Sequence, residues 1–127
     1  MGYRLVDADA VSPAEDRPCR MRRLSDPAGL SQMAVNRFTA EPGEQLPLAY
    51  HYHDEQEEAF YVLSGTLTVE TPDGEFTVEA DDLFAVDPGS PQRAYNPAAA
   101  EESVEVLAIG APPVSGDAVA YDPETDG

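Results

Sequence analysis

The chain has 127 residues, which is enough for one domain and too few for a second independent core. Its 25 acidic residues against 7 basic ones give a formal net charge of −18, which argues against nucleic acid or an anionic membrane surface as a partner. The hydrophobic fraction of 42% is too high for a disordered acidic tail, and the longest purely apolar run, residues 59–63, is too short to span a bilayer.

All seven basic residues are arginine and lysine is absent, a composition similar to that of proteins from extreme halophiles. At molar salt the Debye length falls to about 3 Å, so repulsion among the carboxylates would be screened there. An ordinary acidic protein of the cytosol is the alternative. The single cysteine, Cys19, cannot form an intrachain disulfide, and the first residues contain no apolar signal segment, so we expect a cytoplasmic location.

Residues 1–32 carry three prolines and an acidic start, and they predict a partly irregular N-terminal segment. After them the chain changes to short segments rich in β-branched and aromatic residues, separated by turn residues. Pro72-Asp73-Gly74 predicts a hairpin, since glycine supplies a positive φ. In chain order we expect strands at MAVNRFT (33–39), LAYHYH (48–53), EEAFYVLSG (57–65), TLTVET (66–71), EFTVEA (75–80), LFAVDPG (83–89), PQRAYN (91–96) and SVEVLAIG (103–110).

Residues 111–127 are rich in proline, glycine and aspartate, and they predict a loosely docked acidic tail. Short strands at regular spacing, with turns between them and no convincing helical period, favour an all-β sandwich or barrel. The sequence therefore predicts a single all-β domain over residues 33–110, preceded by the N-terminal segment and followed by the tail.

The two histidines of the chain stand two residues apart, at His51 and His53. Side chains alternate between the faces of a strand, so both imidazoles should project from one face and Tyr50 and Tyr52 from the other. A turn after His53 would place a glutamate opposite the pair. Two imidazoles and one carboxylate suit a divalent transition metal and leave positions open for water, dioxygen or substrate. The same spacing is also compatible with hydrogen-bonded or solvated imidazoles that bind no metal.

Two glutamates, Glu57 and Glu58, follow the histidines closely. Apolar residues occupy both faces of the strand expected there, so periodicity alone leaves open which glutamate faces the pair. Here the sequence resembles the cupin superfamily, whose first motif has Gly, His-x-His, three or four residues, Glu, six residues and Gly. This chain has Gly43, His51-Tyr52-His53, four residues, Glu58, six residues and Gly65. The interval to Gly65 matches the family for Glu58, and we expect Glu57 to be a solvated surface acid.

The second cupin motif has Gly, five residues, Pro-x-Gly, two residues, His, three residues and Asn. This chain has Asp81, five residues, Asp87-Pro88-Gly89, two residues, Gln92, three residues and Asn96. Aspartate tolerates turn conformations, so the fold should survive the changes at Asp81 and Asp87. The departure that bears on function is Gln92, which stands where the family places its last metal-binding histidine. In the first motif, Gly43 lies two residues farther from His51 than the family pattern allows.

Gln92 could still offer its amide oxygen to a metal. An amide oxygen is a harder and weaker donor than imidazole, which would favour Fe(II) or Mn(II) over Zn, Cu or Ni. If the amide turns away, His51, His53 and Glu58 remain and resemble the facial triad of non-haem iron oxygenases. If affinity falls further, the site would bind no metal and the histidines would be polar pocket groups.

The resemblance covers about residues 33–110 and implies a cupin-like β-barrel, which is a double-stranded β-helix or jelly roll. It also implies a homodimer, to which residues 1–32 could contribute. Arg17, Arg20, Arg22 and Arg23 form an unusual cluster in so acidic a chain. We expect them to pair with carboxylates of the fold or of a second subunit, and binding of an anionic ligand is the alternative.

The sequence therefore predicts a cupin that binds a small molecule and a mononuclear divalent metal, with His51, His53, Glu58 and Gln92 as the candidate ligands. Oxygenase and isomerase chemistry are both implied by the resemblance, and no catalytic residue is assigned. The alternative is a non-catalytic ligand-binding or sensing cupin whose metal site is degraded or absent. Gln92 favours this alternative, because losing a ligand costs a catalytic site more than a binding pocket.

Overall fold

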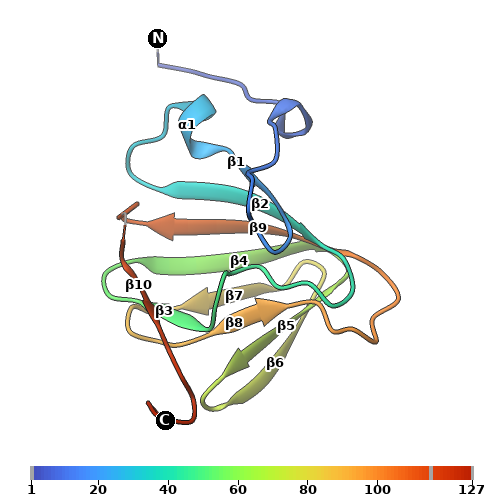
Figure 1. The fold of residues 1–127 in the computed structure, drawn as a ribbon. Coiled ribbons are helices and arrows are strands. Elements are labelled where there is room, and N and C mark those ends of the chain that lie inside the picture. Colours follow the sequence, from blue (N-terminus) through green and yellow to red (C-terminus); the bar gives the residue numbers. More distant parts are fainter. Residues whose placement is uncertain (1, 115, 127) are drawn as a thin grey trace.

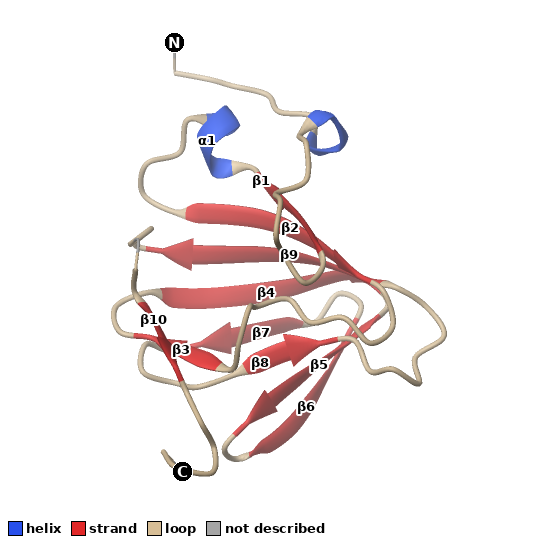
Figure 2. Ribbon diagram, viewed as in Figure 1, coloured by secondary structure: helices blue, strands red, loops and turns tan. Residues whose placement is uncertain are grey.

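The computed structural model describes residues 2–114 and 116–126. Almost all regular structure within them is β (Figures 1 and 2), and the helices are one 3₁₀ turn (Ala8–Ala10) and α1 (Ser25–Ala28), both in the N-terminal segment. The prediction of an all-β jelly-roll barrel is confirmed. No helix in the described part of the chain is long and apolar enough to cross a membrane.

The strands form two facing layers. The first layer is a sheet with the strand order β1 (Arg20–Arg23), β2 (Ala34–Ala40), β9 (Val104–Ala111), β4 (Glu57–Ser64) and β7 (Leu83–Val86). The second layer contains β6 (Gly74–Glu79), β5 (Thr66–Thr71) and β8 (Arg93–Tyr95), and a separate pair of β10 (Ala118–Ala120) with β3 (His51–His53). Isolated bridges between Gln45 and Tyr95 and between His51 and Gln92 connect the region of β3 to β8.

Alternation of side chains along these strands builds one core between the layers. On β9, Val104, Val106 and Ala108 point inward and are buried, while the residues between them are half-buried. Leu67 and Val69 of β5 face them from the other layer and are fully buried in the same cluster. The strand signal in these segments was strong because it was period-two and rich in β-branched residues.

Two turn residues explain parts of the cupin pattern. Gly65 has φ +78°, and a Cβ there would lie 2.4 Å from the carbonyl oxygen of Ser103, so only glycine fits. Asp81 adopts φ +72° in the turn between β6 and β7, the conformation for which glycine is usual. Its carboxylate accepts a hydrogen bond from the Tyr61 hydroxyl at 2.9 Å. The substitution of Asp81 for the motif glycine is therefore accommodated, as expected.

The structure differs from the expected elements at both ends of the chain. β1 pairs with β2 and β10 pairs with β3, and neither strand was expected. The sequence of β1 is dominated by arginine and that of β10 by alanine, so neither shows the apolar alternation or the β-branched residues that indicate a strand. The strand expected at residues 48–53 is shorter, because only His51–His53 pair with a neighbour.

Candidate metal centre

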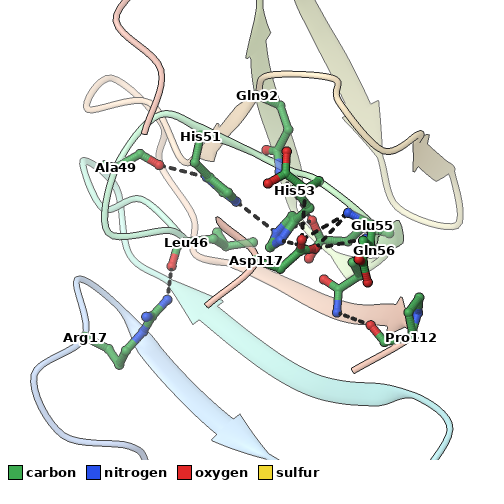
Figure 3. Close-up of polar contacts among 12 residues, drawn as sticks. Arg17, Leu46, Ala49, His51, His53, Glu55, Gln56, Gln92, Pro112 and Asp117 are labelled. Atoms are coloured by element: carbon green, nitrogen blue, oxygen red, sulfur yellow. Dashed lines mark hydrogen bonds and ion pairs between the residues drawn. The ribbon is translucent and has the colours of Figure 1, made fainter. Parts of the chain in front are cut away.

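Three of the expected site residues come together at one end of the barrel. His51 and His53 extend from β3 on the same face, and Glu58 reaches them from β4. One potential ligand atom from each lies within 4.8 Å of the others. Figure 3 shows the two imidazoles pointing toward each other. Glu57 is exposed, as expected for the glutamate on the opposite face.

The distances between these atoms suit ligands of one ion. His51 Nε2 and His53 Nε2 are 3.2 Å apart, and His53 Nε2 is 3.7 Å from Glu58 Oε1. Donor atoms at about 2.1 Å from a shared ion stand about 3.0–3.4 Å apart in tetrahedral or octahedral geometry. The imidazole pair matches this separation, and the carboxylate needs a movement of a few tenths of an ångström.

His51 is set up to present Nε2 as a lone pair, whereas Nδ1 of His53 is buried and has no hydrogen-bond partner among the described residues. His51 Nδ1 lies 2.9 Å from the carbonyl oxygen of Ala49, which can only accept, so the ring proton is on Nδ1. His53 Nδ1 faces Asp117 Oδ2 at 3.6 Å. Burial lowers the pKa of His51 and of His53 below the usual histidine value, so both rings are neutral at neutral pH. Neutral imidazole is the form that binds a metal.

Glu58 is a half-buried carboxylate without a cationic side chain beside it. Burial raises the pKa of Glu58 to about 7. Its one hydrogen bond to another side chain in the described residues comes from Gln92 Nε2, at 3.4 Å. A carboxyl group in this position is stable either when it is protonated or when a cation lies beside it. His51 and His53 are placed to bind the same cation.

Asp117 is a site residue that the sequence analysis missed. It lies in the tail, is 6% exposed, and its carboxylate accepts hydrogen bonds from the backbone N–H groups of Asp54, Glu55 and Gln56 at 3.0–3.2 Å. Burial opposes its ionisation, but the N–H groups and the adjacent His53 ring together lower the pKa of Asp117. Asp117 thus holds the turn between β3 and β4 and faces the ring of His53 (Figure 3).

Gln92 lies directly beside His51 in the second layer. The two residues exchange backbone hydrogen bonds of 2.8 and 3.2 Å, so their side chains share a face. Gln92 is 2% exposed, and Ala94 and Asn96 are buried on the same face. Its Oε1 is buried and has no hydrogen-bond partner among the described residues. A buried oxygen of this kind is costly unless a ligand or ion satisfies it, so the donor set fits a divalent metal.

A cavity of about 330 Å³ opens beside the histidines. Its wall is formed by Arg17, Pro47, Leu48, Ala49, His51, His53, Ala118 and Ala120. The volume is at the lower end of the range for small-molecule sites. The strand β10 supplies the two alanines, so the tail closes one side of the cavity.

Two members of the arginine cluster, Arg22 and Arg17, have different surroundings, and the neighbouring Cys19 is buried. Arg22 pairs with Asp9 at 3.7 Å, as expected for a structural arginine, whereas Arg17 lies at the cavity. Cys19 is 6% exposed, and burial raises the pKa of its thiol to about 11, so this cysteine is unreactive at neutral pH.

Comparison with known proteins assigns the fold to a family. The family model described as the Cupin domain matches residues 36–110, which include both histidines, Glu58 and Gln92. The chain belongs to the cupin domain family. The match covers the strands from β2 to β9 and leaves out β1 and β10, so Arg17 and Asp117 lie outside the region that the family model describes.

Solved structures give the same fold. A cupin superfamily sugar phosphate isomerase from Silicibacter pomeroyi is 26% identical with a TM-score of 0.70, over 85% of this chain and 75% of that one. A protein from Acidithiobacillus ferrooxidans, provisionally assigned as a sugar phosphate isomerase, is 28% identical with a TM-score of 0.65. That match covers 73% of this chain and 58% of the other. This cupin therefore spans little more than half of that neighbour.

A third structure extends the fold comparison to the whole chain. A cupin protein from Bacteroides fragilis is 19% identical with a TM-score of 0.71, and the match covers 100% of this chain and 96% of that one. At this identity the similarity shows the fold alone. No curated protein matches the chain.

Proposed function

We propose that this cupin binds one divalent metal ion through His51, His53 and Glu58 and acts on a small oxygen-bearing molecule in the adjacent cavity. The observation that carries the proposal is the convergence of three ligand atoms within 4.8 Å, two of them on histidines that line the cavity. The lone pair on His51 Nε2, fixed by the Ala49 carbonyl, and the uncompensated charge of Glu58 support it. Gln92 is the fourth ligand or a hydrogen-bonding neighbour of Glu58.

The donor set favours Fe(II) or Mn(II). Two imidazoles with one carboxylate and an amide oxygen form a harder site than one with three imidazoles. A bound ion would polarise a carbonyl or hydroxyl oxygen of the ligand, or bind dioxygen. His51 and His53 would hold the ion at the cavity wall, and Asp117 would keep His53 in orientation.

Between the two reaction types, isomerisation has the better support. Two neighbours that are 26% and 28% identical carry sugar phosphate isomerase descriptions. Among the described residues, no carboxylate lines the cavity wall itself. Glu58, as a metal ligand, would not be free to act as the base, so the support for isomerisation comes from the two neighbours and assigns no proton-transfer residue.

The first test is metal content, measured by elemental mass spectrometry on protein purified in high salt without chelators or a histidine tag. Near-stoichiometric Fe or Mn is expected. Glu58→Gln should weaken Mn(II) binding by more than about 100-fold, because it removes a charged ligand. Glu57→Gln is the matched control, since it makes the same change at the exposed neighbouring position. Equal binding by both variants, or no metal uptake by the native chain, would overturn the proposal.

A non-catalytic binding or sensing cupin is the second candidate. The observation that favours it is Gln92, a neutral amide where the family motif has a histidine. Such a protein would retain its ligand after chelation of the metal and would show no turnover. An enzyme would lose turnover both on chelation and in the His51→Ala variant, so the two candidates separate in one set of assays.

The assembly and location of the chain stay predictions. We propose a homodimer in the cytoplasm, on the basis of the cupin resemblance and the single unpaired cysteine. Sedimentation velocity in molar KCl tests the dimer, and a single species at 13.6 kDa would contradict it.

A further inference from the structure

Arg17 is an arginine without a carboxylate. The arginine–carboxylate pairs among the described residues join Arg22 to Asp9, Arg37 to Glu105 and Arg93 to Glu70. Arg17 makes none of these pairs, and neither do Arg4, Arg20 and Arg23, although the chain contains 25 acidic residues. The position of Arg17 is what sets it apart. This residue lies on the wall of the cavity that His51 and His53 line.

The hydrogen-bonding capacity of this guanidinium is only partly used. Nη2 donates to the carbonyl oxygen of Leu46 at 2.9 Å (Figure 3), while Nε is buried and has no partner among the described residues. An arginine has five N–H donors in a planar fork that matches a carboxylate or a phosphate. A partly buried guanidinium held by one carbonyl therefore leaves a donor surface that an oxyanion would satisfy.

The rest of the cavity is consistent with a small anion. Apart from Arg17 and the two histidines, its wall is made of Pro47, Leu48 and three alanines, and no acidic side chain in the described part of the chain lines it. In a protein of net charge −18, this cavity is a local region where an anion meets positive charge.

We infer that the cavity binds a small molecule carrying a carboxylate or a phosphate, with Arg17 pairing with the oxyanion while another oxygen of the same molecule faces His51 and His53. The second half of this inference rests on the proposed metal function, and the first half does not. The cavity of about 330 Å³ limits the ligand to a small molecule. Arg17 is thus a substrate-binding residue supplied by the N-terminal segment, outside the 36–110 region of the family match.

Calorimetric titration with three probes tests the inference, on protein with and without Mn(II). Glycolate carries a carboxylate, glycerol 3-phosphate carries a phosphate, and glycerol is neutral. At least one anion should bind the native chain, and glycerol should bind at least about tenfold more weakly. Binding of glycolate alone identifies a carboxylate ligand, and binding of glycerol 3-phosphate alone identifies a phosphate ester.

Arg17→Gln should weaken the binding of the anion by at least about tenfold, and Arg17→Lys by less, because lysine retains the charge without the fork. Arg20→Gln is the matched control, since it removes the same charge from an exposed position three residues away and should change binding by less than about twofold. Thermal unfolding of each variant checks that the loss of the bond to Leu46 has not unfolded the chain. If Arg17→Gln does not fold, the comparison of Arg17→Lys with Arg20→Gln decides.

The outcomes separate this inference from the proposed function. Loss of anion binding in Arg17→Gln with unchanged Mn(II) affinity supports the inference. If the native chain takes up no Mn(II), the metal function fails, and anion binding to the metal-free protein still tests Arg17. Failure of both anions to bind, equal binding of glycerol, or equal losses in Arg17→Gln and Arg20→Gln would overturn the inference while leaving the metal site intact.

Discussion

The first sheet and the strand that carries the histidines are built in different ways. β2 and β9 pair over seven residues, and β9 also pairs along β4, with Val104 and Val106 buried beneath them. β3 pairs with β10 over three residues, joins β8 through one bridge, and has no fully buried residue. The framework therefore depends on its core, whereas the histidines depend on a few polar contacts around a short strand.

This difference predicts that stability and metal affinity can be changed separately. Substitutions beneath the long ladders should lower the free energy of unfolding without altering the site in molecules that remain folded. Substitutions around β3 should lower metal affinity with little change in the free energy of unfolding, because few apolar contacts are lost there. In this cupin, metal affinity should therefore respond to residues at the ends of the chain, such as Asp117.

The largest effect is expected from a core substitution in the first sheet. Phe38 on β2 is 7% exposed and pairs with Met21 and Val106 in the adjacent strands. Phe38→Ala should cost about 3–5 kcal/mol, through lost burial and the cavity left behind. Urea unfolding in molar KCl measures this cost. Phe76→Ala, at a position 47% exposed, is the matched control and should cost much less. Equal costs would contradict the assignment of the core to this sheet.

The next effect is expected at Asp117, where metal affinity should fall. In Asp117→Asn, the amide N–H would point at one of the backbone N–H groups that now donate a hydrogen bond to the carboxylate. The substitution would also remove the negative charge that faces His53. Loss of such a supporting group weakens metal binding by about 10–100-fold. Calorimetric titration with Mn(II) measures it.

Asp54→Asn makes the same change in the exposed turn after β3 and is the control for net charge near the site. Its Mn(II) affinity should stay close to that of the native chain. If both variants bind Mn(II) equally, Asp117 stabilises the turn without positioning the histidine.

Metal affinity should also depend on pH through Glu58. The pKa of Glu58 is raised to about 7, so below that pH the ion must displace a proton from the carboxylate. The pKa values of His51 and His53 lie below the usual histidine value, so the ion competes with protons for these rings only at lower pH. Mn(II) affinity should rise by up to about tenfold per pH unit between pH 5.5 and 7 and then level off. An affinity that does not change across this range would exclude Glu58 as a ligand.

Much of the barrel and the histidine site could be predicted from the sequence because the signals are local. Short runs of β-branched and aromatic residues between turn residues located the strands β4, β5, β6 and β9, and Pro72-Asp73-Gly74 located the hairpin. The pairing of His51 with His53 on one face follows from the period of a strand alone. The choice of Glu58 over Glu57 needed the family spacing, because both faces of β4 are apolar.

The contributions of the chain ends could not be predicted, because their partners are distant in sequence. Asp117 contacts a turn more than sixty residues away, and nothing in an acidic, proline-rich tail distinguishes this aspartate from its neighbours. Arg17 looked like one member of a cluster, and only the fold separates it from Arg22, which has a carboxylate partner. Such roles depend on tertiary packing and not on local periodicity.

The smallest effect concerns salt, and it should differ between the two regions. The chain carries a net charge of −18, and its tail adds Asp122, Glu124 and Asp126 beside β10. Removing molar KCl lengthens the range of repulsion from about 3 Å to about 10 Å or more. The thermal midpoint should fall by several degrees, and amide exchange should rise more in Ala118–Ala120 than in Val104–Ala111, because the shorter pairing opens first.

Sucrose at the osmolality of the KCl should not restore the midpoint, since it does not screen charge. An unchanged midpoint in dilute buffer would contradict the halophilic interpretation, whereas a uniform rise in exchange would show that the tail is held as firmly as the core.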